Sequence, residues 1–145
     1  MLLSLFISHS FSNLLIIILQ VVTLLFSLKI CYPSRVFLVR GNHEFKDVNS
    51  SMESVGFGHI CKGMFGEVLG TDLYDSIHEA FNYLPLSARV NKSILVLHGG
   101  IGDGSFTLED LKTIPRPLFD FRLDDRVTNI LWSDPSDSDA VMDRY

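Results

Sequence analysis

Two short stretches of the sequence carry side chains that can bind a metal ion, and each stretch follows an apolar run. Asn42–Glu44 follows residues 36–39, and His98 follows residues 94–97. An amide oxygen combined with an imidazole nitrogen suits a borderline divalent ion such as Mn, Fe or Zn, whereas sets made only of carboxylates suit Mg or Ca. Glycines beside both stretches allow the backbone to approach an ion or a phosphate closely.

Each stretch also has a purely structural interpretation. An isolated histidine at the end of a strand usually makes a structural hydrogen bond, and the Gly99-Gly100 pair after His98 is typical of a turn. In open α/β sheets, ligands gather just beyond the carboxyl ends of strands, where loops present side chains from a rigid scaffold. Either loop taken singly favours the structural interpretation, so the functional hypothesis depends on finding both loops in one pattern.

The strands that would position these loops can be predicted from short apolar runs. Residues 36–39 form a continuous run of the kind found in fully buried strands. Residues 86–90 and 94–97 flank a short polar turn at residues 91–93 and predict a hairpin or two adjacent strands. The sequence therefore predicts that both candidate loops begin where a buried strand ends.

Helices are predicted on either side of this hairpin. Residues 49–83 have a helical pattern in two pieces, separated by a glycine-rich region at residues 56–63. Thr107 and Asp110 have the spacing of a capping box and predict a short helix that ends before Pro115. Helices and strands together indicate an α/β protein.

Residues 1–28 carry no charged side chain, and the apolar stretch 14–28 admits three interpretations. Its length falls between those of a core helix and a membrane span, and a span would have to recruit the more polar residues 6–13. A secretory signal would have basic residues before the stretch, and none occurs. We favour a core helix that is buried on most sides against the strand at residues 36–39, with Lys29 in its last turn.

Composition excludes some classes of protein. With 145 residues, of which 47% are hydrophobic and 20% charged, the chain is typical of one globular domain. The net charge of −5 arises in residues 102–145, and no cluster of Lys and Arg occurs, so a nucleic-acid-binding protein is not expected. Cys31 and Cys61 show neither disulfide nor zinc spacing, which favours a reducing compartment, cytoplasmic or nuclear.

Three motifs in register resemble the phosphoprotein phosphatase family of serine/threonine phosphatases. They are Arg-Gly-Asn-His-Glu within residues 37–44, His-Gly-Gly within residues 97–101, and Trp-Ser-Asp-Pro within residues 131–135. Gly-Asn-His-Glu alone is shared in looser form across the calcineurin-like metallophosphoesterases, but the three motifs in this order are specific. We therefore divide the chain into a hydrophobic leader of uncertain origin, residues 1–20, and a partial catalytic domain, residues 21–145.

The resemblance implies a β-sandwich flanked by helices, which holds two divalent ions of the Mn, Fe or Zn type between strand-end loops. It implies that Asn42 and His98 ligate one ion, each at about 2.0 to 2.3 Å. It also implies that His43 is the general acid that protonates the leaving serine or threonine oxygen. Five further residues match motif positions and would surround the site: Arg40, Glu44, Gly99, Gly100 and Asp134.

The implied reaction is metal-dependent hydrolysis of phosphoserine and phosphothreonine in protein substrates, with a regulatory subunit as an expected partner. The family's Asp-x-His and Asp-Arg-Gly motifs, which supply other ligands, do not occur in this sequence. We therefore expect at most one partial metal site, and little activity from this chain alone. Two alternatives stay open: a non-catalytic fragment or pseudo-phosphatase that binds partner proteins, and a chain anchored in a membrane by residues 2–28.

Overall fold

The computed structural model describes residues 2–3 and 12–134. The helices in this part of the chain are α1 (Ser12–Cys31), α2 (Lys46–Ser50), α3 (Phe57–Phe65), α4 (Glu67–Phe81), α5 (Leu108–Lys112) and α6 (Asp125–Trp132). The strands are β1 (Leu2–Leu3), β2 (Phe37–Leu38), β3 (Ser87–Val90) and β4 (Ile94–Leu97). Short 3₁₀ helices occur at Asn42–Glu44, Glu53–Val55 and Phe121–Leu123.

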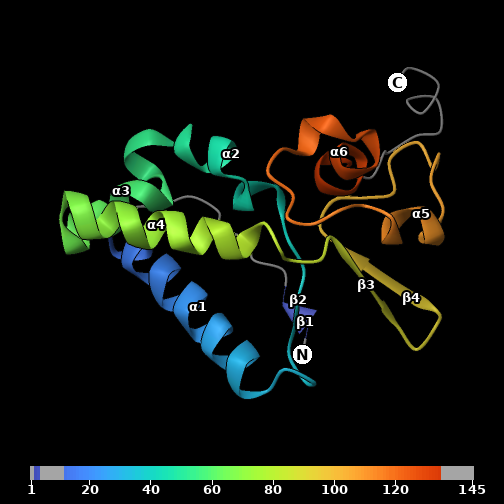
Figure 1. Ribbon diagram of the computed structural model, residues 1–145, viewed down its shortest axis with the longest axis horizontal. Coiled ribbons are helices and arrows are strands. Elements are labelled where there is room, and N and C mark those ends of the chain that lie inside the picture. The colour runs from blue at the N-terminus through green and yellow to red at the C-terminus, as the bar shows by residue number, and fades with distance from the viewer. Residues whose placement is uncertain (1, 4–11, 135–145) are drawn as a thin grey trace.

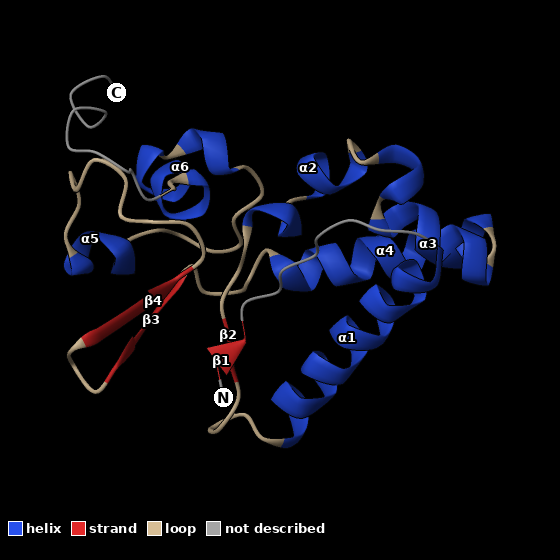
Figure 2. Cartoon of the chain, turned by 180° about the vertical axis from the view of Figure 1, so that it is seen from behind, coloured by secondary structure: helices blue, strands red, loops and turns tan. Residues whose placement is uncertain are grey.

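These elements gather in two groups along the molecule (Figure 1 and Figure 2). Helices α1 to α4 lie at one end, and the β3–β4 hairpin lies with α5 and α6 at the other. Between the two groups, β2 pairs in parallel with β1, with Leu2 opposite Phe37. The predicted α/β class is confirmed as a helix-rich fold, and the described strands form two separate pairs.

Helix α1 buries one stripe of its apolar surface. Ile18 and Leu19 join a core cluster with α3 and α4, and Leu25 joins a second cluster with Leu38 of β2. The predicted packing of this helix on the strand that follows it is therefore confirmed. Burial on most sides is wrong, since Leu24 is 58% exposed because neighbouring elements cover only one face of the helix. None of the helices in the described part of the chain combines the length and the apolarity that a bilayer crossing requires.

Lys29 lies in the last turn of α1, as predicted, and holds the chain that leaves the helix. Its ammonium group donates to the carbonyl oxygens of Pro33 and Val36, each at 2.9 Å. A cation beside the last carbonyls of a helix also interacts favourably with the helix dipole. This arrangement turns the chain from α1 directly into β2.

The helical insert between β2 and β3 is confirmed. One of its breaks, residues 51–56, includes Gly56 of the predicted region, and a second break at Gly66 was not predicted. Helix α3 runs through Gly58 and Gly63 and ends at Gly66, whose φ is +80°. A helix tolerates an interior glycine at a cost of about 1 kcal/mol, whereas a left-handed residue ends it. Helices α3 and α4 pack so closely at Gly70 that a Cβ there would lie 2.5 Å from the carbonyl oxygen of Cys61. The absence of a side chain at Gly70 allows this approach.

Strands β3 and β4 form the predicted antiparallel hairpin, with Val90 opposite Ile94. Asn91 and Lys92 in its turn have φ values of +49° and +61°. The expectation that β4 is buried is wrong, because the hairpin packs on the core through one face and leaves Ile94 56% exposed. Phe37 of β2 is likewise 48% exposed, so only part of the residues 36–39 run is buried.

The predicted capping box at the start of α5 is confirmed. The Asp110 N–H donates to Thr107 Oγ1 at 3.2 Å, and the Thr107 N–H donates to Asp110 Oδ2 at 2.7 Å. Each side chain thus satisfies a backbone group that the helix itself leaves unpaired.

Helix α6 supplies the centre of the core that supports the candidate loops. Its buried residues Val127, Ile130 and Leu131 recur at helical spacing and form a cluster with Phe45 and Leu118, among others. Phe45 directly follows the Asn42–Glu44 turn, so this cluster fixes the position of that loop. The same helix also contacts the loop after β4, as described below.

Candidate metal and phosphate site

The loops after β2 and β4 meet at one point. Nε2 of His98 lies 3.0 Å from Oδ1 of Asn42, across 56 positions of sequence. The predicted proximity of these side chains is confirmed, although the two strands belong to different sheets. In this arrangement the ring donates its Nε2–H to the amide oxygen, in the tautomer that the contact requires.

The geometry of the pair fits two neighbouring ligands of one divalent ion. Oxygen and nitrogen ligands bind such ions at about 2.1 Å, so two ligands at right angles lie about 3.0 Å apart. The observed separation of Asn42 Oδ1 and His98 Nε2 is also 3.0 Å. Burial lowers the pKa of His98, and the charge of His43 lowers it further. This favours the neutral ring that an ion needs. To bind an ion through Nε2, the ring would carry its proton on Nδ1 instead of on Nε2.

The described residues offer two candidate ligands for a metal ion, fewer than a metal site needs. Catalytic ions usually have three protein ligands and structural ions four. Asn42 and His98 provide two, and within residues 2–3 and 12–134 no group of three or more His, Cys, Asp or Glu side chains is arranged to hold an ion. An ion bound by this pair would therefore need further ligands.

Gly41 separates the side chains of Glu44 and His98. A Cβ at this position would come 2.6 Å from Glu44 Oε2 and 3.0 Å from the His98 ring, so a larger residue would displace one of them. The Gly41 N–H donates to Glu44 Oε2 at 2.8 Å. Burial raises the pKa of Glu44 to about 7, while the hydrogen bond from Gly41 and the charge of Arg40 oppose the rise. Glu44 thus holds the backbone of the loop from its buried side.

His43 is half-buried and is held by residues that follow it. Its Nδ1 lies 3.3 Å from the Met52 sulfur, a weak acceptor, and this contact is a hydrogen bond when Nδ1 carries a proton. The buried amide of Asn49 donates to the His43 carbonyl oxygen at 3.3 Å. Because the charge of His43 influences the pKa of His98, the two rings belong to one electrostatic environment.

Arg40 is completely buried beneath the loop and does not face solvent. Its guanidinium donates to the carbonyl oxygens of Leu118 and Glu44, at 2.6 and 2.8 Å, and to Asn82 Oδ1 at 2.9 Å. It also stacks 3.6 Å from the centre of the Phe45 ring. Burial lowers the pKa of Arg40 to about 10, and the charge of Glu44 opposes this shift. Arg40 therefore joins three distant segments of the chain under the site.

Gly99 and Gly100 bring the loop after β4 against the end of α6. The Gly99 N–H donates to the Ile130 carbonyl oxygen at 2.7 Å. A Cβ at Gly99 would lie 2.8 Å from that oxygen, and one at Gly100 would lie 3.0 Å from Ser133 Cβ. Gly99 therefore requires glycine for this close approach, and a side chain at Gly100 would be crowded by Ser133. Asp134, the last residue that the structure describes, follows Ser133 and is exposed.

The structure thus brings Asn42, His43 and His98 together, with Glu44 and the two glycines behind them. Sequence reasoning missed the residues that hold these groups from a distance: Asn49 and Met52 beside His43, and Asn82 and Leu118 beside Arg40. A polar residue on the apolar side of a helical segment, as at Asn49, is the signal that could have found one of them.

Known proteins resemble this chain in sequence. The family model described as calcineurin-like phosphoesterase matches residues 16–144. The serine/threonine-protein phosphatase BSL2 of Arabidopsis thaliana is 37% identical over 123 residues, which are 85% of this chain and 12% of that protein. A Caenorhabditis elegans relative, also named as a serine/threonine-protein phosphatase, is 37% identical over 119 residues, 81% of this chain and 30% of the relative.

A solved structure shares the fold. A serine/threonine phosphatase from Saccharomyces cerevisiae, described as similar to human phosphatase PP5, superposes with a TM-score of 0.71 and 34% sequence identity. The match covers 83% of this chain and 36% of the yeast chain, so the sequence spans only about a third of that structure. The chain belongs to the calcineurin-like phosphoesterase family, with serine/threonine phosphatases among its relatives.

Proposed function

We propose that this chain carries part of the active site of a metal-dependent serine/threonine protein phosphatase. The observation that carries the proposal is the 3.0 Å separation of Asn42 Oδ1 and His98 Nε2, at the point where two strand-end loops meet. The names of the relatives support phosphoserine and phosphothreonine proteins as the substrate class. A regulatory subunit belongs to the same proposal as a partner of the complete enzyme.

Asn42 and His98 would hold one of two divalent ions of the Mn, Fe or Zn type. When bound, such ions supply a Lewis acid that orients a phosphate and activates a water molecule. The lowered pKa of His98 keeps its ring neutral and available as a ligand at neutral pH. The Gly41 backbone and the buried Glu44 carboxyl group fix the direction of the Asn42 loop.

His43 would act as the general acid. In its imidazolium form, the His43 ring would donate Nδ1–H to the Met52 sulfur and give the proton on Nε2 to the leaving serine or threonine oxygen. A positioned acid of this kind contributes a factor of about 10² to 10⁴ to the rate. In this proposal, Arg40 acts only by holding the loop and makes no contact with the substrate.

The compartment in this proposal is the cytoplasm or the nucleus. Cys31 is exposed, Cys61 is buried, and both are free thiols in the structure. Burial raises the pKa of Cys61 to about 11, so its thiol stays protonated and unreactive. A reducing environment suits an exposed free thiol such as Cys31.

The proposed function can be tested in a chimaera that supplies the missing ligands. The segments of the yeast relative that precede and follow its matched region would be joined to this chain, and phosphate release from a phosphoserine peptide would be measured with added Mn²⁺. We expect metal-dependent hydrolysis, with kcat reduced about 10² to 10⁴-fold by His43→Ala. His98→Ala should instead weaken activation by Mn²⁺.

A matched control separates chemistry from folding. His59→Ala alters an exposed histidine outside the site and should keep the rate of the parent chimaera. A chimaera that folds and binds Mn²⁺ but releases no phosphate would contradict the catalytic proposal and favour a protein that binds partners only.

A further inference from the structure

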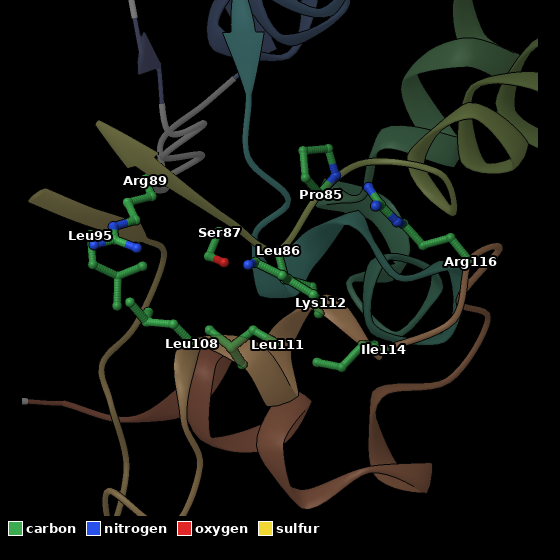
Figure 3. Close-up of a pocket in the computed structure, with 10 residues that line it drawn as sticks. All are labelled: Pro85, Leu86, Ser87, Arg89, Leu95, Leu108, Leu111, Lys112, Ile114 and Arg116. Atoms are coloured by element: carbon green, nitrogen blue, oxygen red, sulfur yellow. The ribbon is translucent and has the colours of Figure 1, made fainter. Parts of the chain in front are cut away.

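A groove lies between the β3–β4 hairpin and α5, away from the paired Asn42 and His98 side chains. Its volume is about 210 Å³. Its apolar lining comes from β4, α5 and the chain around them, namely Leu86, Leu95, Leu108, Leu111 and Ile114 (Figure 3). Leu86 and Ile114 are buried at 8% and 7% exposure, whereas Leu108 is 38% exposed. The groove therefore has a fixed floor and an accessible apolar side.

Three cationic side chains line the same groove, and they are spread along it. Figure 3 shows Arg89 and Leu95 at one end and Arg116 beside Pro85 at the other, with Lys112 between them in this view. The chain as a whole carries a net charge of −5, so this cationic rim differs from the average surface. The groove thus combines an apolar floor with positive charge at both ends.

The cations at the two ends are not neutralised by described carboxylates. The Arg89 guanidinium donates twice to the Lys92 carbonyl oxygen, at 3.0 and 2.6 Å. The Arg116 guanidinium reaches the Tyr83 carbonyl oxygen at 3.5 Å. Lys112 differs, because it pairs with Glu109 at 2.7 Å. Carbonyl contacts orient a guanidinium but leave its charge available to an acidic partner.

The length of the groove sets the distance between the acidic groups of a partner that would reach both ends. Ser87 and Arg89 line it from alternate positions of β3, and Pro85 and Leu86 line it just before that strand begins. Four residue steps of extended chain span about 13 Å. An extended peptide has the same repeat, so side chains at its positions i, i+2 and i+4 would face the groove together.

We propose that this groove binds an extended acidic segment of a partner protein, with the pattern acid–x–apolar–x–acid. Its central apolar side chain would contact Leu108 and Leu111, which lie between the two ends in Figure 3, and its two carboxylates would pair with Arg89 and Arg116. Leu95 precedes His98 by three residues on β4, so the docked segment would lie about 10 Å along the chain from the candidate site. The proposal concerns binding alone and does not depend on catalysis by His43.

The test uses the full 145-residue chain and a fluorescein-labelled peptide, Ser-Gly-Glu-Ser-Leu-Ser-Glu-Ser-Gly, with binding measured by fluorescence anisotropy. Arg89→Glu together with Arg116→Glu should weaken binding by about tenfold or more, because two favourable charge pairs become repulsive. Raising the salt from 50 to 500 mM should weaken the wild-type interaction as well. Leu108→Ser, at the accessible apolar side, should also reduce affinity.

Matched controls make each outcome decisive. Lys62→Glu together with Arg122→Glu makes the same total charge change at two surface positions outside the groove, and this chain should bind like the wild type. Peptides with Ser in place of Leu, or with the two Glu residues directly beside the Leu, should bind at least several-fold more weakly. Equal binding of all three peptides would overturn the proposal and indicate a general anion patch. Unchanged binding by the Arg89→Glu and Arg116→Glu chain would overturn it as well.

Because a charge-reversed chain can fail to fold, a second measurement is made on the wild type alone. Addition of the labelled peptide should shift the methyl NMR signals of Leu108 and Leu111 and leave those of Ile17, on the exposed face of α1, unchanged. Shifts confined to residues outside the groove would also overturn the proposal.

Discussion

The Gly99 N–H donates to the Ile130 carbonyl oxygen at 2.7 Å, which ties the loop that carries His98 to helix α6. Ile130 is fully buried in the core cluster that also contains Phe45. Phe45 directly follows the Asn42–Glu44 turn. One cluster of apolar side chains therefore positions both loops of the candidate site, and changes in it should affect both.

Gly99→Ala should destabilise the protein and move the His98 loop. The new Cβ would lie within 3.0 Å of backbone atoms of Ile130, Leu131 and Ser133, which cannot rotate away. Overpacking of this kind lowers the free energy of unfolding by about 1 to 3 kcal/mol. Urea denaturation of the variant and the wild type would measure this loss. Gly63→Ala is the matched control: its Cβ meets nothing within 4 Å in the interior of α3, so it should stabilise by up to about 1 kcal/mol. Equal stability of the two variants would contradict the claim that the chain at Gly99 has no room for a Cβ.

Arg40→Met should lower stability strongly without touching Asn42 or His98. The substitution removes three hydrogen bonds and leaves the Leu118 and Glu44 carbonyl oxygens and the Asn82 amide oxygen without their donor. Breaking such a buried arrangement costs about 3 to 5 kcal/mol, which would lower Tm by roughly 10 °C in a domain of this size. Differential scanning calorimetry measures this shift.

The control for Arg40 is an arginine on the surface. Arg122 pairs with Asp47 and Asp120, and its side chain is 56% exposed. Arg122→Met should change stability by less than about 1 kcal/mol. If Arg40→Met were as mild, the proposed role of Arg40 as the junction of three segments would be wrong.

The stability of the protein should depend on His78 below neutral pH. This histidine is 2% exposed between the rings of Tyr74 and Phe81, and burial lowers its pKa to about 4, aided by the charges of Arg40 and Lys46 and opposed by Asp75. As the pH falls from about 6.5 to about 4, the unfolded chain takes up a proton on His78 before the folded chain does. The free energy of unfolding should therefore fall by up to about 3 kcal/mol over this window.

His78→Phe removes this proton uptake. The difference in unfolding free energy between wild type and variant, measured by urea denaturation at several pH values, should grow in favour of the variant as the pH falls below 6.5. His59→Phe, at an exposed position on α3, is the control for replacing a histidine by phenylalanine. Parallel curves for wild type and His78→Phe would mean that His78 does not carry this effect.

The sequence predicted the features that depend on neighbouring residues. The hairpin followed from its turn at residues 91–93, and the capping box followed from the spacing of Thr107 and Asp110. The proximity of Asn42 and His98 followed from the family motifs, because no local pattern relates residues so far apart in sequence. These predictions succeeded because residues close together in the sequence, or motifs in a known order, limit how the chain can fold between them.

The features that the sequence did not predict depend on distant parts of the chain. Arg40 reaches the Leu118 carbonyl oxygen across 78 positions, and no spacing along the sequence indicates that contact. The exposure of Ile94 depends on which face of the hairpin meets the core, and apolar composition alone cannot give this. The break at Gly66 was missed because only its left-handed φ distinguishes it from the helical glycines before it.

The 145-residue chain alone should show little or no Mn²⁺-dependent hydrolysis of a phosphoserine peptide. Two protein ligands do not fix the geometry of an ion or of the water that it activates. The assay compares the chain with its His43→Ala and His98→Ala variants. Robust turnover that both variants lose would mean that other residues, such as Asp103 or Asp134, or a second chain complete the site.

The central claim is that Asn42 and His98 bind one divalent ion, and paramagnetic NMR tests it most directly. Mn²⁺ would be titrated into ¹⁵N-labelled chain while the ring nitrogens of His98 and the side-chain amide of Asn42 are observed. We expect these signals to broaden first, and the amide of Asn91, at the exposed tip of the hairpin, to stay sharp. His98→Ala should abolish the broadening at Asn42. Broadening that begins elsewhere, with the Asn42 and His98 signals unchanged at millimolar Mn²⁺, would contradict the account.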